Sequence, residues 1–275
     1  MPSGESFDQI IASAPVAPDS AIPAGSLMAK IKSRGVLNVG GTETSALFSL
    51  KDPVTGKVIG FDAGLAQLLA KYITGSPKVN LVQVSVATRE ALLQNGTVDT
   101  VQATYTITPA RAQKIGFAGP YYSSGDAILV AKDNHGITKV ADLAGKTVCT
   151  QSSSTAANSI KQFAPTANII LFETNSECQQ AVKQKRADAY VLDQAILLGN
   201  AYRDKDVKVV GEPFTTEPYG IGVPLDSPEM KSFVNDWLKT IEANGEWAKL
   251  WKATIGTVVS GDVPAPPVTG SAQGS

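Results

Sequence analysis

The chain has 275 residues, of which 43% are hydrophobic and 18% charged, and its formal net charge is −1. This composition is typical of a globular protein, and it excludes the intrinsically disordered class and the strongly basic nucleic-acid-binding class. A chain of this length exceeds what one compact core usually serves, so two lobes are expected. Apolar runs stay shorter than the roughly 18 residues that cross a bilayer, and no signal-peptide pattern opens the sequence, which predicts a soluble chain.

Both ends are rich in Pro, Ser and Ala, which predicts flexible tethers over residues 1–28 and 261–275. Between them, short β-rich runs alternate with helical patterns, which is typical of α/β units. The first series has strands at 36–39, 79–86 and 98–103 and helices at 64–73 and 89–94, with Asp62 placed to cap the first helix.

A second series follows Lys132, and two closing helices come after it. Strands are expected at 146–150, 169–172, 187–192 and 207–210, and helices at 154–163, 177–185, 194–202, 232–243 and 246–252. Two successive α/β series predict two α/β lobes.

Motifs for metal, nucleotide or nucleophilic chemistry are missing from the sequence. The two cysteines, Cys149 and Cys178, are too few for a zinc site, and the single histidine, His135, offers no partner. Neither a GxSxG nor a GxGxxG pattern occurs, so we expect no cofactor, no metal and no hydrolase chemistry. The cysteines leave two alternatives open, a disulfide or two buried thiols.

Two arginines break the rules for helix starts. Thr108 and Pro109 are a natural N-cap and first helical residue, which puts Arg111 in the first turn, and Thr88 likewise precedes Arg89. A cation there opposes the helix dipole. Because arginines and helix N-termini both favour carboxylates, the two positions predict anion sites at the carboxyl ends of strands. The alternative is a surface arginine tolerated at a small cost.

A complementary anion is expected in the second series. Asp193 ends an apolar strand and precedes a helix, so it could cap that helix or accept an ammonium group. Ser153, Ser154 and Thr155 also lie between a strand and a helix, where hydroxyls usually act as caps. A cleft between two lobes would bring these groups to Arg111, as an amino-acid zwitterion requires.

Six segments in order resemble the extracellular solute-binding proteins that serve ABC importers of polar amino acids, over roughly residues 35–251. They are GFD at 60–62, TYTITPAR at 104–111, FAGPYY at 117–122, DLAGK at 142–146, ADA at 187–189 and EPYGI at 217–221. The segment TREALLQNG at 88–96 and the two cysteines are similar to those of actinobacterial glutamate-binding lipoproteins.

The resemblance implies an α/β, two-lobed periplasmic-binding-protein fold with two hinge strands, expected at 126–132 and 219–224. Lobe 1 would comprise 29–127 plus 222–260, and lobe 2 would comprise 128–221. It also implies a disulfide between Cys149 and Cys178 and an extracytoplasmic location, with a lipid anchor in the native form whose signal and anchor are absent from this chain.

The family's ligand-binding roles carry over by position. Arg111 matches the arginine that holds the ligand α-carboxylate, assisted by Thr106 and the backbone around Thr104, and Asp193 matches the acceptor of the α-ammonium. Further roles fall to the second-lobe hydroxyls Ser153, Ser154 and Thr155, to Arg89 at the ligand side chain, and to Thr42 and Asn175, which stand where enterobacterial relatives place an arginine and a histidine.

These matches predict a monomeric, non-enzymatic receptor that captures glutamate, aspartate, glutamine or asparagine. It would deliver the amino acid to membrane permease and ATPase subunits and would bind no nucleic acid. Two alternatives stay open: an amino-acid sensor, and a dehydratase on the same fold, for which Glu43 is the nearest general acid.

Overall fold

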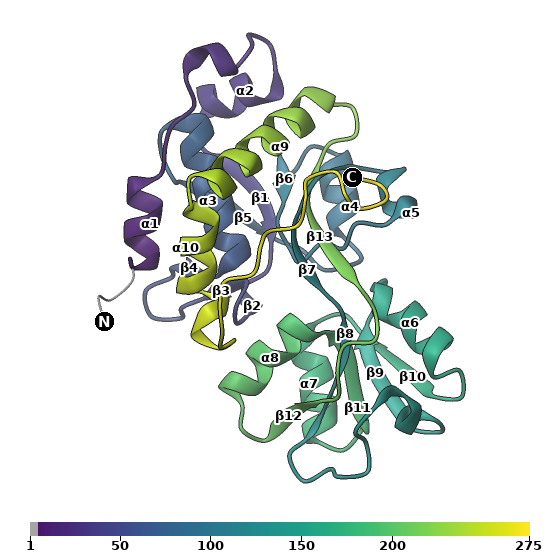
Figure 1. The fold of residues 1–275 in the computed structure, drawn as a ribbon. Coiled ribbons are helices and arrows are strands. Elements are labelled where there is room, and N and C mark those ends of the chain that lie inside the picture. The colour runs from purple at the N-terminus through teal and green to yellow at the C-terminus, as the bar shows by residue number, and fades with distance from the viewer. Residues whose placement is uncertain (1–4) are drawn as a thin grey trace.

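Two α/β lobes make up residues 5–275, the part of the chain that the computed structural model describes (Figure 1). The sheet of lobe 1 has the order β5-β1-β6-β13-β7 and that of lobe 2 the order β10-β9-β11-β8-β12. A small sheet, β2-β3-β4, extends lobe 1. No helix within residues 5–275 is long and apolar enough to span a bilayer.

Lobe 1 combines both ends of the chain with its first α/β series. Its strands are β1 (Leu37–Gly41), β2 (Thr44–Ser45), β3 (Ser49–Lys51), β4 (Val58–Ile59), β5 (Val79–Gln83), β6 (Thr100–Val101), β7 (Gly116–Ser124) and β13 (Glu217–Val223). Its helices are α1 (Phe7–Ser13), α2 (Leu27–Arg34), α3 (Phe61–Thr74), α4 (Arg89–Gln94), α5 (Pro109–Ala112), α9 (Pro228–Ala243) and α10 (Glu246–Ala253), with short 3-10 turns at Asp19–Ala21 and Ile255–Thr257.

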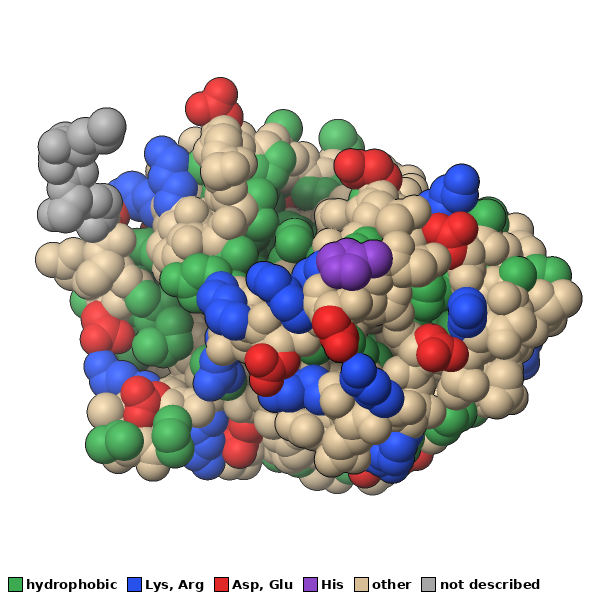
Figure 2. Space-filling view, turned by 90° about the horizontal axis from the view of Figure 1, so that it is seen from below, with side chains coloured by type: hydrophobic (Ala, Val, Ile, Leu, Met, Phe, Trp, Pro, Cys, Tyr) green, Lys and Arg blue, Asp and Glu red, His purple; other side chains and the backbone are tan. Residues whose placement is uncertain are grey.

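Lobe 2 is one continuous stretch of chain. Its strands are β8 (Asp126–Ala131), β9 (Thr147–Gln151), β10 (Asn168–Phe172), β11 (Ala189–Asp193) and β12 (Val207–Val210). Its helices are α6 (Thr155–Phe163), α7 (Asn175–Lys183) and α8 (Gln194–Arg203), with a 3-10 turn at Val140–Leu143. Seen from this end of the molecule, Lys and Arg side chains are interspersed with Asp and Glu (Figure 2).

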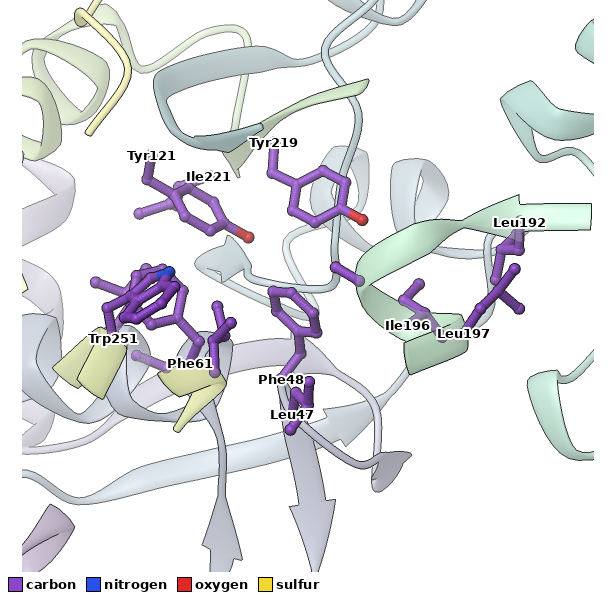
Figure 3. Close-up of a cluster of buried hydrophobic side chains, with 14 of the residues drawn as sticks. Leu47, Phe48, Phe61, Tyr121, Leu192, Ile196, Leu197, Tyr219, Ile221 and Trp251 are labelled. Atoms are coloured by element: carbon purple, nitrogen blue, oxygen red, sulfur yellow. The ribbon is translucent and has the colours of Figure 1, made fainter. Parts of the chain in front are cut away.

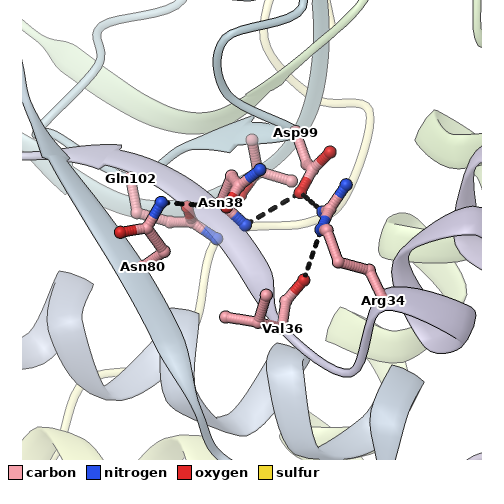
Figure 4. Close-up of polar contacts among 7 residues, drawn as sticks. Arg34, Val36, Asn38, Asn80, Asp99 and Gln102 are labelled. Carbon is pink, nitrogen blue, oxygen red and sulfur yellow. Dashed lines mark hydrogen bonds and ion pairs between the residues drawn. The ribbon is translucent and has the colours of Figure 1, made fainter.

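The strand directions show which edge of each sheet can gather ligand-binding groups. In lobe 1, β1 runs parallel to β5 and β6, and in lobe 2, β9 runs parallel to β10 and β11. The carboxyl ends of parallel strands share one edge, where loops can gather ligand-binding groups. At the opposite, amino ends of β1 and β6, Arg34 pairs with Asp99, whose carboxylate also accepts the backbone N–H of Asn38 at 2.8 Å (Figure 4).

The predicted hinge strands are wrong in position. Strand β8, expected to cross between the lobes, pairs along its length with β11 and β12 inside lobe 2, and β13 belongs to the lobe 1 sheet. The chain crosses instead just after β7 and just before β13, where Ser124 pairs with Glu217. A Cβ on Gly125 would lie 2.1 Å from the carbonyl oxygen of Thr215, so the two crossing segments touch at a residue without a side chain.

The first helix of the series is capped differently from the prediction. The residue before α3 is Gly60, and no side chain caps the helix. Asp62 lies buried inside the first turn, where it accepts the backbone N–H of Thr104 at 2.7 Å and the hydroxyl of Tyr121 at 2.5 Å. Burial raises the pKa of Asp62 to about 6. Its carboxylate therefore ties α3 to the loop after β6 and does not act as a cap.

The predicted N-terminal tether is wrong for the described residues 5–28. Helix α1 has a capping box between Ser6 and Gln9, and it buries Ile10 and Ile11 against α3 and α10. The apolar face of this helix consists of two adjacent isoleucines. The Pro and Ala residues around them kept the sequence from showing a helical pattern. At the other end, residues 261–275 form no helix or strand, yet they lie on lobe 1. Residues 1–4 lie outside the described part.

Cys149 and Cys178 are buried and are free thiols in this structure, whereas the resemblance implies a disulfide between them. Cys149 on β9 has its sulfur 3.4 Å from the carbonyl oxygens of both Cys178 and Ala189. Hydrogen bonding with Cys149, reinforced by burial, raises the pKa of the Cys178 thiol. The structure thus shows the second of the two alternatives that the residues left open.

Candidate functional site

The facing edges of the two sheets enclose a narrow cavity between the lobes. Most of the predicted ligand-binding residues line it, together with four that the sequence reasoning missed. The lining consists of Arg89, Thr104, Thr106 and Arg111 from lobe 1 and Ser154, Thr155 and Asp193 from lobe 2, with Val86, Gln151, Leu192 and Ile196 as the additional residues.

Arg111 reaches across this cavity from one lobe to the other. Helix α5 begins as predicted, with Thr108 accepting the N–H of Arg111 at 3.2 Å and Pro109 in the first turn. The guanidinium donates to the carbonyl oxygen of Thr106 at 2.8 Å and to that of Ser153 at 3.2 Å. Ser153 therefore contributes through its backbone, which has a φ of 62°. This left-handed conformation is uncommon for a residue other than glycine and is a form of strain found at functional sites.

Arg89 is the first residue of α4 and is buried, with 4% of its surface exposed. One terminal N–H donates to the carbonyl oxygen of Ala103 at 2.9 Å, and the guanidinium lies 3.8 Å from the ring centre of Tyr105. Its Nε atom has no hydrogen-bond partner among residues 5–275. Burial, followed by the charge of Arg111, lowers the pKa of Arg89 to about 9. A buried cation with an unused donor is costly unless an anion or acceptor meets it.

The N-cap predicted before Arg89 is not made. Thr88 has a helical backbone, and its side chain makes no cap bond to α4; its hydroxyl oxygen instead accepts the N–H of Ser85 at 2.9 Å. The start of α4 is held by the backbone before it, because the carbonyl oxygens of Ser85 and Thr88 accept the N–H groups of Arg89 at 3.3 Å and Leu92 at 3.2 Å.

Asp193 does not cap α8, which rules out the simpler of its two predicted roles. Its carboxylate accepts the hydroxyl of Tyr219 at 2.5 Å, and the residue is buried. Burial, followed by the charges of Asp126 and Glu217, raises the pKa of Asp193 well above its ordinary value. An ammonium group beside this carboxyl would offset the burial and favour the ionised form.

A second buried carboxyl lies behind Asp193. Asp126 pairs with Asp193 in the register of β8 and β11 and is fully buried. Neither of its carboxylate oxygens has a hydrogen-bond partner in the described part of the chain. Burial, followed by the charge of Glu217, raises the pKa of Asp126 to about 6. The crossing point between the lobes therefore holds three carboxyls, an arrangement that a nearby cation stabilises.

The hydroxyl groups of the second lobe serve local structure as well as the cavity. Ser154 donates to the carbonyl oxygen of Gln151 at 2.7 Å and makes no cap bond to α6. Thr155 donates to the carboxylate of Glu217 at 2.8 Å, which ties the start of α6 to the crossing segment. These bonds orient the loop after β9, where Ser153 presents its carbonyl oxygen to Arg111.

A wider cavity of about 230 Å³ adjoins the first one and shares Arg89, Thr104 and Gln151 with it. Thr42 and Asn175 line this outer part. The side chain of Asn175 already bonds to Asn200 and to the hydroxyl of Tyr190, and it is held at the lobe 2 wall. Gln151 was missed because nothing in its local pattern distinguishes it, although it ends β9 beside the predicted hydroxyls.

The lobes touch beside the cavity. One continuous apolar cluster includes Leu47 and Phe48 of lobe 1 and Ile196 and Leu197 of lobe 2 (Figure 3). A Cβ on Gly199 of α8 would lie 3.2 Å from the side chains of both Ala46 and Leu47. The two lobes are therefore in direct contact, and this contact brings the guanidinium of Arg111 within hydrogen-bond distance of the carbonyl oxygen of Ser153. Residues 5–275 contain no cluster of His, Cys, Asp and Glu that could hold a metal ion.

The sequence matches the family model of bacterial extracellular solute-binding proteins, family 3, over residues 37–257. The chain belongs to this family. It is 43% identical to the glutamine-binding protein of Geobacillus stearothermophilus over 195 residues, 70% of this chain and 74% of that protein. It is 33% identical to the glutamate-binding protein GluB of Corynebacterium efficiens over 242 residues, 84% of this chain and 82% of that protein.

A solved structure agrees in fold. An ancestral amino acid-binding protein, described as a precursor of cyclohexadienyl dehydratase, has 38% sequence identity and a TM-score of 0.75. The match covers 84% of this chain and all of that chain, 100%. The two-lobed architecture predicted from the sequence is thereby confirmed.

Proposed function

We propose that this solute-binding protein captures an L-amino acid with a polar side chain between its lobes and delivers it to the permease and ATPase subunits of an ABC importer. The observation that carries the proposal is the convergence of Arg111 from lobe 1 and Asp193 from lobe 2 on one cavity. Arg111 would bind the α-carboxylate and Asp193 the α-ammonium. Because the two residues belong to different lobes, a ligand that meets both favours the closed form.

The side chain of the ligand would extend toward Arg89 and the outer cavity. Arg89 lines both parts of the cavity, and its guanidinium suits a carboxylate oxygen best and an amide oxygen second. Gln151 borders the same space and could accept an amide N–H. The named relatives bind glutamine and glutamate, and the buried cation leads us to propose glutamate as the preferred ligand and glutamine as the next.

Calorimetry against the twenty amino acids tests this proposal. We expect glutamate to bind and the Arg111→Ala variant to lose affinity by about tenfold or more, which corresponds to about 1.4 kcal/mol. The matched control is Arg186→Ala, at an exposed arginine of lobe 2 outside the cavity, which should bind as the parent does. Full affinity in Arg111→Ala would contradict the assignment of the site.

The dehydratase alternative has the weaker support. Glu43, its candidate general acid, pairs with Lys51 at 3.0 Å, is 37% exposed and does not line either part of the cavity. A general acid must lie within hydrogen-bond reach of the leaving group. We therefore expect the purified protein to leave prephenate and arogenate unchanged, and turnover of either would favour an enzyme.

A further inference from the structure

The segment after the last 3-10 turn crosses the face of lobe 1. In Figure 1 it runs as the yellow trace from the region of α10, over β7 and β13, to the neighbourhood of α4 and α5. Val263 packs against the main core of lobe 1 near the start of this path. The segment contains no helix or strand, so its position depends on contacts with the rest of the lobe.

The contacts concentrate in residues 268–275, which we call the strap. The backbone N–H of Gly270 donates to the carbonyl oxygen of Gly119 in β7 at 2.8 Å. Ala272 packs against a second apolar cluster of lobe 1, which contains Tyr105, Ile107 and Phe117. Two turns shape the strap, through bonds from Ser271 to Val268 and from Ser275 to Ala272, both 3.0 Å.

The end of the strap touches the helix that carries Arg111. A Cβ built on Gly274 would lie 3.0 Å from the Cβ of Ala112 and 3.2 Å from the carbonyl oxygen of Thr108. Gly274 has a φ of 104°, which favours glycine. The backbone of the strap therefore packs directly on the N-cap residue and on the last residue of α5.

Helix α5 buries little surface of its own, although its Ala112 packs against the same apolar cluster and Ile107 and Ile115 on either side of the helix are buried. It has four residues and none of them is buried. A helix this short is not stable by itself, because nucleation costs more than so few hydrogen bonds return. Its guanidinium must nevertheless reach the carbonyl oxygen of Ser153 in the other lobe.

We propose that the strap is a positioning element, which holds α5 so that Arg111 is aligned for the α-carboxylate of the ligand. The inference rests on the proposed function for its ligand and on the contacts of Ala272 and Gly274 for its geometry. Since every amino acid carries an α-carboxylate, loss of the strap should weaken all ligands by a similar factor and leave selectivity unchanged.

The test compares the full chain with a variant that ends at Pro267. We expect the shortened protein to bind glutamate about tenfold more weakly. The ratio of glutamate to glutamine affinity should not change. In the Arg111→Ala background, removal of the strap should have no further effect, because the two changes act on one interaction. Equal affinity of the shortened and full chains would overturn the proposal, as would a loss that persists without Arg111.

Two point variants test the proposal without shortening the chain, so the result does not depend on whether the shortened protein folds. Ala272→Asp places a carboxylate on the apolar cluster, whereas Gln273→Asp adds the same charge at the next residue, which is exposed. We expect weaker binding only for Ala272→Asp. Equal effects would count against the proposal.

Hydrogen exchange supplies a readout that does not depend on the ligand. Amides of residues 109–115 should exchange faster in the shortened protein, and unchanged exchange would contradict the proposal. If the full chain binds none of the twenty amino acids, the proposed function fails. The exchange result then still decides whether the strap holds α5.

Discussion

Asp126 offers the sharpest test of the electrostatics at the crossing point. Its side chain is fully buried and neither carboxylate oxygen has a partner among the described residues. Burial, followed by the charge of Glu217, raises its pKa to about 6, against an ordinary value near 3.8. We expect the Asp126→Asn variant, which cannot ionise, to gain stability relative to the parent as the pH rises.

The sign follows from proton linkage. Between pH 4 and pH 6 the folded parent binds more protons at this position than the unfolded chain does, so its free energy of unfolding falls as the pH rises through that window. A shift of about two pKa units corresponds to at most about 3 kcal/mol. The loss is nearly complete at about pH 7. Asp62, whose pKa is also raised to about 6, is present in both proteins, so its contribution cancels in the difference.

Urea unfolding followed by tryptophan fluorescence at pH 4, 5, 6 and 7 measures the effect. Asp133→Asn is the control, because this exposed carboxylate has its pKa lowered by a hydrogen bond with Lys185, so its stability difference should change below pH 4 and stay nearly constant from pH 5 to pH 7. If the difference in stability between Asp126→Asn and the parent is constant across this range, Asp126 does not retain its proton on folding, and the reasoning fails.

Three further outcomes can be checked. Gly199→Leu should hold the lobes apart, lowering glutamate affinity and raising the radius of gyration in solution scattering with glutamate present, while Tyr202→Leu on the exposed face of α8 should change neither. Arg89→Ala should weaken glutamate more than glutamine, because it removes a charge as well as a donor, and equal losses would refute its proposed place at the ligand side chain. Two thiols per chain should react with an alkylating reagent after denaturation without reductant, whereas two unreactive cysteines would show that Cys149 and Cys178 form the disulfide after all.

Much of the local structure follows from local rules. The prediction of a helix over 89–94 and of a strand over 207–210 is confirmed to the residue, and the cap of α5 by Thr108 is formed as expected. These features depend on neighbouring residues: capping groups, the fixed backbone of proline and the spacing of apolar side chains. The N-terminal helix was missed because its apolar face is short and lies among Pro and Ala residues.

The errors concern partners that are distant in sequence. The apolar pattern of β8 fits a hinge strand and a strand within a sheet equally well, and only its pairing with β11 and β12 decides between them. Asp62 occupies a good position for a cap, yet Thr104 and Tyr121 offer it stronger partners. Sequence rules based on neighbouring residues rank the possible roles of a residue. They do not include hydrogen-bond or strand partners that come from distant parts of the chain.

The sequence by itself determined the two α/β series, the family resemblance and the two arginines at helix starts, since each depends on residues close together in the chain. The tertiary structure alone decided that Asp193 faces a ligand cavity and caps no helix, that Asp126 lies unpaired behind it, and that the last residues pack on α5. The reason is physical: burial, pairing and charge at these positions are set by strands and loops that come together only when both lobes have formed.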